Sequence, residues 1–321
     1  MAVSTKNLHD GHRLFGRGEN DNRPLSSETT AAARLRVVGR AQRLDIDYPH
    51  LALRLEAESG ILWARMRHRE RACYTPELMR DMRDAQMLLR DLYAGHGAGD
   101  LPFRWLVWAS DAPRVWSLGG DLTRFTAMIR SGDEAGLRAY AHLAIDILHD
   151  NHVNLDLPIQ SAALVQGDAI GGGFEAMLTD DLVVAERGAK FGLPEILFNL
   201  FSGMGAQSFL ERKLGPLMAR TLIEDGITRS ADEMKELKLV DIVCEPGEAE
   251  EALRRHVAAN NARFNTLLTL QRVRHRANPV TKRELYDIVD LWTDLAMGLG
   301  EPELRRMDAL ARVQQKKRVG G

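Results

Sequence analysis

Three consecutive glycines, Gly171 to Gly173, stand where an apolar strand is expected to give way to a helix, with Glu175 in the first turn of that helix. Ser161 to Val165 has the composition of a strand, and the helix is expected from Phe174 onward. The first N–H groups of a helix lack intrahelical partners and favour negative charge. Glycine has no Cβ, so a ligand can approach this backbone closely. The turn is therefore expected to bind a developing oxyanion, although the glycines could instead serve only tight packing.

A second carboxylate, Glu195, interrupts the apolar stretch from Phe191 to Phe198. Gly192 and Pro194 predict a turn there, not the interior of a helix. Carboxylates placed in apolar sequence are expected to have raised pKa values, and two of them suit proton transfer. Either carboxylate alone could equally be a paired structural acid.

Another pair of glycines, Gly119 and Gly120, lies between an apolar strand expected at Trp105 to Ala109 and an amphipathic helix expected at Leu122 to Ile129. This arrangement repeats that of the triple-glycine turn. One backbone donor from each turn would form a two-donor oxyanion hole.

With these motifs, the chain resembles the enoyl-CoA hydratase/isomerase, or crotonase, superfamily over about residues 100–245. The family's two oxyanion donors match Gly120 and Gly172, and the two glutamates of its hydratases match Glu175 and Glu195. The resemblance implies an α/β fold, a spiral of ββα units with a C-terminal helical region. It also implies homotrimers or hexamers. No cofactor is expected.

A narrower resemblance, to the bacterial RpfF-type synthases of diffusible signal factors, covers residues 45–315. It implies an enzyme that dehydrates a 3-hydroxyacyl chain on acyl carrier protein to a cis-2-enoyl chain. The same enzyme would then hydrolyse the thioester and release a fatty acid used in quorum sensing. The segments that carry this resemblance include Val115-Trp-Ser-Leu-Gly-Gly-Asp-Leu122, Gly192-Leu-Pro-Glu-Ile-Leu-Phe198 and Asp290-Leu-Trp-Thr-Asp-Leu-Ala-Met-Gly-Leu-Gly300.

The resemblance to the signal-factor synthases also singles out Met204, Trp292 and Leu310 as the lining of an acyl-chain pocket. Packing in the core or at a subunit interface is the alternative for these apolar residues. An unbranched chain gains roughly 0.8 kcal/mol for each methylene buried, so such a pocket would supply much of the substrate binding.

Two other functions remain open. The first is an enoyl-CoA hydratase of fatty-acid metabolism, which would act on a CoA thioester. The second is a binding protein that docks a regulatory partner, because the resemblance implies the receiver domain of a sensor kinase as a partner. Retention of both Glu175 and Glu195 argues against binding as the only role.

The composition fits a soluble cytoplasmic enzyme. A chain of 321 residues with 45% hydrophobic content can bury a sizeable core, and a net charge of −2 gives no support to nucleic-acid binding. Cys73 and Cys244 lie far apart, and no signal peptide is recognisable. No stretch approaches the roughly 20 apolar residues of a membrane span. His149 and His152 have no companions that would complete a metal site.

Three regions are expected along the chain. Residues 1–40 are polar and are expected to be mobile or weakly ordered, residues 41–245 form the core domain, and residues 246–321 form the C-terminal helical region. Within the core, a hairpin is expected from Leu51 to Arg67. A helix capped by Thr75, with proline at its first position, is expected to run to about Tyr93.

Overall fold

The computed structural model describes residues 44–316. The N-terminal segment 1–40, expected to be mobile, lies outside the described residues. The strands form two sheets, one of seven strands in the order β1-β2-β3-β4-β6-β8-β11 and one of four in the order β10-β9-β7-β5. Their bounds are β1 Ile46–Asp47, β2 Leu51–Glu56, β3 Ile61–Met66, β4 Trp105–Ser110, β5 Val115–Ser117, β6 Gln160–Val165, β7 Asp168–Ile170, β8 Leu182–Glu186, β9 Lys190–Gly192, β10 Arg229–Ser230 and β11 Ile242–Cys244.

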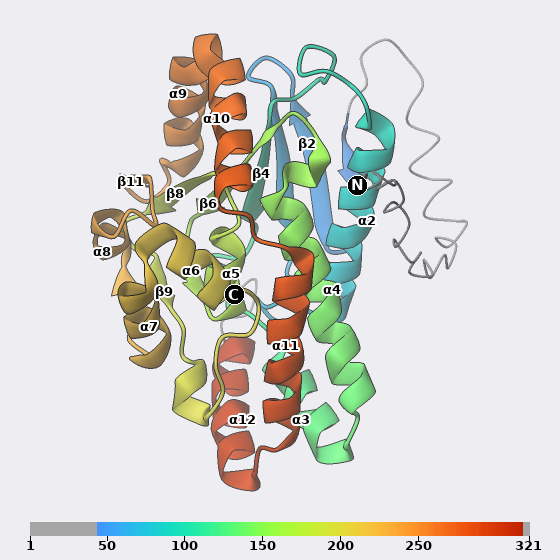
Figure 1. Ribbon diagram of the computed structural model, residues 1–321, viewed down its shortest axis with the longest axis vertical. Helices are drawn as coiled ribbons and strands as arrows, with labels where there is room; N and C mark the ends of the chain where they lie inside the picture. The colour runs from blue at the N-terminus through green and yellow to red at the C-terminus, as the bar shows by residue number, and fades with distance from the viewer. Residues whose placement is uncertain (1–43, 317–321) are drawn as a thin grey trace, which may run out of the picture. The chain divides into compact units, whose positions relative to one another are not determined.

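The helices are interspersed between the strands and then follow them without interruption (Figure 1). The α-helices are α2 Pro76–Tyr93, α3 Leu122–Ser131, α4 Glu134–His152, α5 Gly172–Met177, α6 Ala206–Leu214, α7 Pro216–Glu224, α8 Ala231–Glu236, α9 Ala249–Asn260, α10 Phe264–Ala277, α11 Lys282–Met297 and α12 Glu301–Lys316. Three short 3₁₀ helices are η1 Asn154–Asp156, η2 Glu195–Phe198 and η3 Asn261–Arg263.

Successive segments add one strand to each sheet and then a helix. Strands β4, β6 and β8 are parallel neighbours in the large sheet, and β5, β7 and β9 are parallel neighbours in the small one. Helices α3 and α4 follow the first pair of strands, and α5 follows the second. This repetition confirms the expected spiral of ββα units and the α/β class, with helices from α9 to α12 forming the C-terminal helical region.

The strands that lead into the two glycine turns differ from the expectation. The expected strands at Trp105 to Ala109 and Ser161 to Val165 are present, but β5 and β7 stand between them and the glycines. Each of these intervening strands has three residues, which is too short for a recognisable alternation of apolar and polar positions. The glycine turns therefore follow the carboxyl ends of β5 and β7 in the small sheet.

The N-terminal hairpin and the first long helix are confirmed. Strands β2 and β3 pair antiparallel, with Leu51 opposite Met66, and Gly60 takes a left-handed conformation (φ 68°) in the turn between them. The Thr75 side chain accepts a hydrogen bond from the Leu78 N–H (3.3 Å) and caps α2, whose first residue is proline.

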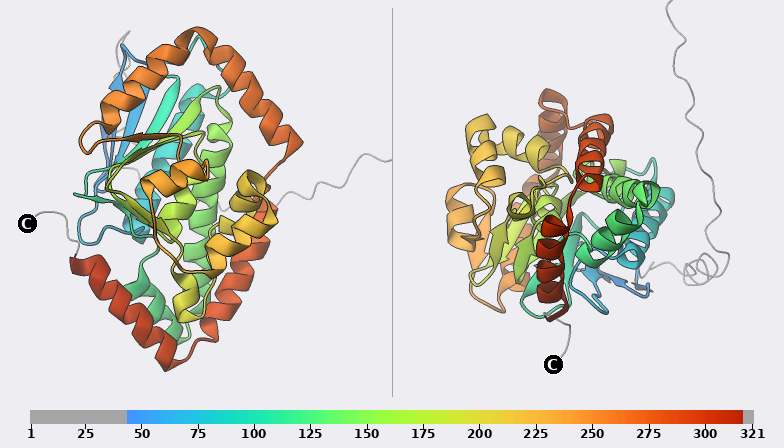
Figure 2. Two further views of the ribbon diagram at one scale, coloured as in Figure 1. Left: turned by 90° about the vertical axis from the view of Figure 1, so that its left-hand side faces the viewer. Right: turned by 90° about the horizontal axis from the view of Figure 1, so that it is seen from below.

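The large sheet is covered on both faces, as expected for a mostly parallel sheet. Alternate residues of β3, β4, β6 and β8 pack with α9 on one face, in a cluster that includes Trp63, Val107 and Leu253. The residues between them pack in the main core, together with α2 and α4. The covering helices are visible in Figures 1 and 2.

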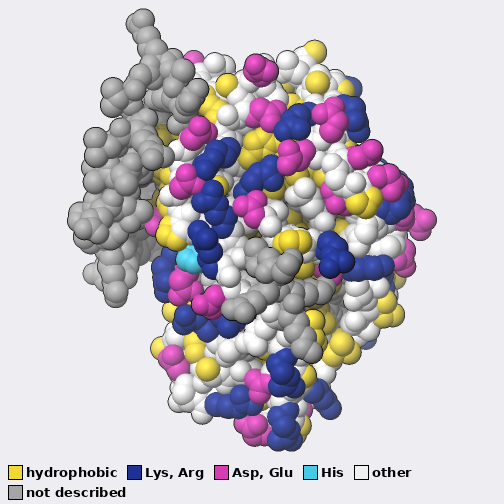
Figure 3. Space-filling model, turned by 180° about the vertical axis from the view of Figure 1, so that it is seen from behind, with side chains coloured by type: hydrophobic (Ala, Val, Ile, Leu, Met, Phe, Trp, Pro, Cys, Tyr) yellow, Lys and Arg dark blue, Asp and Glu magenta, His cyan; other side chains and the backbone are white. Residues whose placement is uncertain are grey.

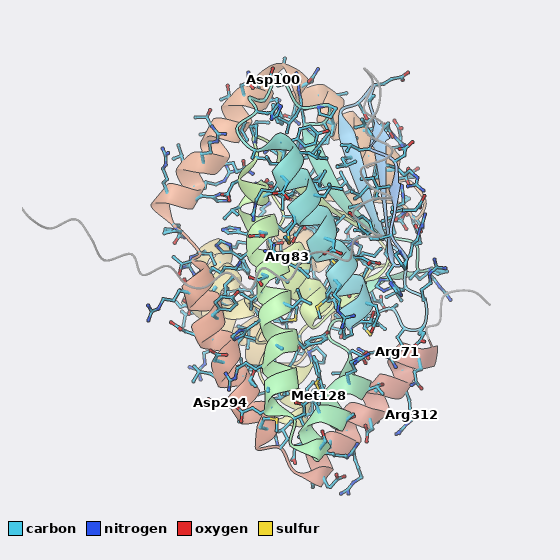
Figure 4. All side chains as sticks on the ribbon, turned by 90° about the vertical axis from the view of Figure 1, so that its right-hand side faces the viewer. Arg71, Arg83, Asp100, Met128, Asp294 and Arg312 are labelled. Atoms are coloured by element: carbon cyan, nitrogen blue, oxygen red, sulfur yellow. The ribbon has the colours of Figure 1, made fainter. Side chains whose placement is uncertain are left out.

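Charged side chains of both signs are interspersed over the face shown in Figure 3. Many charged side chains elsewhere in the fold form ion pairs. Arg83 lies between α2 and α4 (Figure 4), where it donates a hydrogen bond to Asp150. Burial alone would raise the pKa of Asp150, but hydrogen bonds from His149, Arg90 and Arg83 hold it well below its usual range.

The last two helices lie at the end of the molecule opposite α9 and α10 (Figures 1 and 2). Helix α11 packs along α4, and α12 packs along α3, so both lie beside the sheet edge that carries the glycine turns (Figures 1 and 2). In the part of the chain that the structure describes, no helix combines the length and apolarity needed to cross a membrane.

Candidate active site

A cavity of about 410 Å³ lies between the glycine turns, the 3₁₀ helix η2 and the helices α11 and α12. Its lining comes from segments far apart in the sequence, and most of its surface is apolar. All seven residues singled out from the sequence line this one cavity: Gly120, Gly172, Glu175, Glu195, Met204, Trp292 and Leu310.

The two glycine turns touch one another. A Cβ added at Gly119 would lie 2.7 Å from the amide nitrogen of Gly172, closer than real contacts allow. Gly119 also has a left-handed backbone conformation (φ 79°), which side chains disfavour. The close approach of the two turns therefore requires glycine at position 119.

The two amides matched to an oxyanion hole are both available. Among the described residues, neither the Gly120 N–H nor the Gly172 N–H donates a hydrogen bond to a protein acceptor. Gly172 is the first residue of α5, so its N–H is one of the unpaired donors at the start of a helix. Both glycines line the same cavity, which makes that cavity suited to a negatively charged oxygen.

Glu175 is almost fully buried, with 1% of its surface exposed. Its Oε1 accepts hydrogen bonds from the backbone N–H groups of Met204 (2.8 Å), in the loop before α6, and Ala206 (3.0 Å), the first residue of α6. Burial raises the pKa of Glu175, and the neighbouring charge of Glu195 raises it further, whereas the two N–H donors oppose these effects.

Glu195 is the first residue of η2 and is partly exposed to the cavity. Its Oε2 accepts a hydrogen bond from the Ser202 hydroxyl (2.8 Å). Burial raises the pKa of Glu195 as well, while the Ser202 hydroxyl opposes the rise. Two interacting carboxyls with raised pKa values can hold one proton between them near neutral pH, so one can act as an acid and the other as a base.

The apolar part of the cavity is closed by the C-terminal helices. Trp292 of α11 packs so tightly on Gly203 that a Cβ added there would lie 2.5 Å from its ring. The Trp292 ring also makes an edge contact with Phe125, with 5.3 Å between centroids. Met204 and Leu310 line the same cavity from the loop before α6 and from α12. This part of the cavity therefore has an apolar lining.

Three polar residues of the site were missed by the sequence analysis. Ser202 bonds to Glu195, and the Tyr140 hydroxyl accepts a hydrogen bond from the backbone N–H of Asp121. Gln314 of α12 donates to the carbonyl oxygens of Leu118 (2.9 Å) and Gly120 (3.0 Å). The sequence carries one weak signal for Gln314, since it follows Leu310 by one helical turn and so shares its face.

The cysteine and histidines considered as reactive groups lie outside this cavity. Burial raises the pKa of the Cys73 thiol to about 12, so it is a poor nucleophile at neutral pH. Within the described range, no group of three or more His, Cys, Asp or Glu side chains is placed to hold a metal ion. His152 instead makes ring contacts with Phe209, edge to face, and with His275.

Known proteins share this fold. The fold resembles an enoyl-CoA hydratase from Bacillus halodurans, with a TM-score of 0.68, 19% identity, and coverage of 81% of this chain and 99% of that one. It also resembles Pseudomonas aeruginosa DspI, with a TM-score of 0.57, 23% identity, and coverage of 76% of this chain and 96% of that one. These likenesses concern the fold alone.

The sequence match is more specific. Residues 58–284 match the enoyl-CoA hydratase/isomerase family, and the chain belongs to that family. A curated relative is the fatty acid oxidation complex subunit alpha of Idiomarina loihiensis, which is 33% identical over 129 residues. That match covers 40% of this chain and only 17% of the much longer relative.

Proposed function

We propose that this protein is a synthase of a cis-2-unsaturated fatty-acid signal of the diffusible-signal-factor type. It would dehydrate a 3-hydroxyacyl chain carried on acyl carrier protein and then hydrolyse the enoyl thioester. The observation that carries the proposal is the meeting of two interacting carboxyls, two free amides and an apolar chamber in one cavity. The narrower sequence resemblance to the RpfF-type synthases supports the choice of substrate.

The dehydration step uses both glutamates. The thioester carbonyl accepts hydrogen bonds from the Gly120 and Gly172 amides, which stabilise the enolate formed when one glutamate removes the C2 proton. The other glutamate protonates the departing C3 hydroxyl, so the C3–O bond breaks and water leaves. The products of this step are the 2-enoyl thioester and one water molecule.

The release step uses the same amides. A glutamate takes a proton from water, whose oxygen attacks the thioester carbonyl, and the tetrahedral oxyanion lies between Gly120 and Gly172. The C–S bond then breaks, the thiol of the carrier leaves with a proton, and the free 2-enoic acid remains. The apolar lining at Met204, Trp292 and Leu310 would hold the acyl chain during both steps.

An alternative is an enoyl-CoA hydratase of fatty-acid metabolism, and the curated fatty-acid-oxidation relative favours it. Hydratases add water to trans-2-enoyl-CoA and do not cleave the thioester. The two functions are separated by assaying the purified chain with matched 3-hydroxyacyl carrier protein and trans-2-enoyl-CoA, and by following water loss and free thiol. Release of thiol together with an unsaturated acid supports the synthase. Rapid hydration of enoyl-CoA without thiol release supports the hydratase.

Three further expectations belong to the same proposal. The chain would assemble as a homotrimer or hexamer, which light scattering tests. The receiver domain of a sensor kinase would bind it as a regulator, in addition to its catalytic role. A pull-down with wild type and a Glu175→Ala variant tests that partner, since a docking surface outside the cavity would keep its affinity in the variant.

A further inference from the structure

The loop that presents the Gly120 amide is held by hydrogen bonds at nearly every backbone group. The N–H groups of Leu118, Gly119 and Asp121 donate to the Ala72 carbonyl (2.7 Å), the Ser117 hydroxyl (3.2 Å) and the Tyr140 hydroxyl (3.2 Å). The Gly120 N–H is the exception within the described chain, since it has no protein acceptor. The loop is thus organised around one free donor.

The direction of that donor is set by the neighbouring peptide groups. A peptide unit is planar, and its N–H points opposite to its C=O. The Gly119 carbonyl, which shares a plane with the Gly120 N–H, accepts from the Tyr74 N–H (2.8 Å). The preceding and following peptide groups contain the carbonyls of Leu118 and Gly120, and both carbonyl oxygens accept a hydrogen bond from the Gln314 Nε2. Three consecutive carbonyls are therefore fixed, two of them by one side chain.

Gln314 comes from a helix that is remote in the sequence. Helix α12 lies beside α3. In Figure 4, Met128 is labelled on α3 and Arg312 on α12. Arg130 of α3 forms ion pairs with two residues of α12: Glu301, its first residue (2.9 Å), and Asp308, near its middle (2.8 Å). Its apolar face is buried through Leu304 and Met307. The helix thus brings an amide donor to the loop from a well-packed support.

The environment of Gln314 indicates a role other than stability. Its side chain is buried, with 4% exposed, yet its Oε1 has no hydrogen-bond partner within the described structure. An unpaired buried polar atom is destabilising, so an apolar side chain of the same length would be tolerated at least as well by packing alone. What glutamine provides, and an apolar side chain does not, is the pair of donations to the loop.

We propose that Gln314 is a positioning residue that fixes the Gly120 amide and so couples the docking of α12 to completion of the oxyanion hole. The proposal rests on the proposed function only for its effect on turnover. It assigns to the C-terminal helix a part in the polar half of the site, in addition to the apolar lining supplied by Leu310.

The test compares wild type with Gln314→Met, which keeps length and helix propensity but removes both donors. Gln315→Met, at the adjacent exposed position of α12, is the matched control. Hydrogen exchange of peptides covering residues 72–76 and 116–122 is followed by mass spectrometry, which needs no substrate. Thermal unfolding, kcat and KM are measured on the same samples with the thioester that wild type turns over best.

The expected result for Gln314→Met is exchange about 10-fold faster in the two loop peptides, because two hydrogen bonds that hold the loop are lost. kcat should fall about 10- to 100-fold with KM changed less than about 3-fold, since the amide acts mainly in the transition state. Tm should stay within about 3 °C of wild type. The Gln315→Met control should match wild type in every measurement.

Unchanged loop exchange in Gln314→Met would overturn the proposal. So would wild-type kcat, or a large loss of Tm with kcat retained, because either would leave Gln314 with at most a structural role. If Gln314→Met does not fold, Gln314→Leu replaces it, since leucine also lacks the donors and adds no buried charge. If wild type turns over no thioester, the proposed function fails, and the exchange data still decide whether Gln314 holds the loop.

Discussion

Glu195 packs directly against Gly171: a Cβ added at Gly171 would lie 2.5 Å from the Glu195 Oε1. The glycine therefore does more than allow the turn before α5. It leaves the space in which the carboxyl of Glu195 approaches the cavity that also contains Glu175. The triple-glycine motif and the second glutamate, separated in the sequence, form one structural unit.

Gly171→Ala should displace the Glu195 carboxyl and reduce kcat about 100-fold, because small misplacements of a catalytic group are costly. Stability should also fall by about 1–2 kcal/mol, since Gly171 has a left-handed conformation (φ 56°). Steady-state kinetics and urea unfolding measure the two effects. Gly188→Ala is the control, because a Cβ there meets no atom within 4 Å. Wild-type turnover in Gly171→Ala would contradict this packing requirement.

Glu175→Gln and Glu195→Gln should each reduce kcat by about 10²–10⁴-fold, the usual contribution of general acid–base catalysis. Glutamine keeps the shape of the side chain, so circular dichroism should remain that of wild type. Glu224→Gln on the exposed side of α7 should leave kcat unchanged. An active Glu175→Gln variant would show that this carboxyl takes no part in proton transfer.

The contribution of Glu175 and Glu195 to stability should fall as the pH rises from about 4.5 through the neutral range. The ordinary pKa of a glutamate is 4.5, and both glutamates have raised pKa values in the folded chain. In this window these two carboxyls therefore hold more protons in the folded state than in the unfolded state, so their titration favours unfolding as the pH rises. The Glu175→Gln, Glu195→Gln double variant lacks this effect and should gain about 1–3 kcal/mol over wild type between pH 5 and pH 8.

Urea unfolding of both proteins at pH 5 and pH 8 measures that difference, and comparison with the variant cancels the other titrating groups. Parallel loss of stability in wild type and the double variant would mean that the two carboxyls do not hold a proton in the folded state.

Leu310→Trp should narrow the apolar chamber and shift preference toward shorter acyl chains. For each methylene of the acyl chain that no longer fits in the chamber, kcat/KM should fall about fourfold, the equivalent of about 0.8 kcal/mol. A series of thioesters of increasing chain length measures the shift. Leu291→Trp on the exposed face of α11, where Leu291 is 63% exposed, should not change the profile. An unchanged profile in Leu310→Trp would place the acyl chain elsewhere.

Much of the site could be predicted from the sequence because its chemistry is concentrated in short motifs. Glycines at a helix start and two glutamates in apolar surroundings together indicate an oxyanion site with proton transfer. The choice of Gly172, Glu175 and Glu195 as its residues came from the family resemblance. The ββα spiral was expected only from the family resemblance. Periodicity alone detected the long strands of the large sheet and missed β5 and β7, whose three residues carry almost no pattern.

The contacts between remote segments could not be predicted in this way. Gln314 is an ordinary polar residue on an amphipathic helix, and only the docking of α12 beside α3 brings it to the loop at Leu118 and Gly120. The hydroxyl of Ser202 likewise gains its meaning from the 2.8 Å contact with Glu195. Such positioning depends on tertiary packing, which no local pattern records.

Mass spectrometry of lipid extracts tests the central claim most directly. The extracts come from cells expressing wild type or the Glu175→Ala, Glu195→Ala double variant at equal levels. The proposed synthase predicts a free cis-2-unsaturated fatty acid in the wild-type extract and its absence from the variant extract. Equal amounts in both extracts, or none in either, would contradict the synthase and leave the enoyl-CoA hydratase as the function to assay.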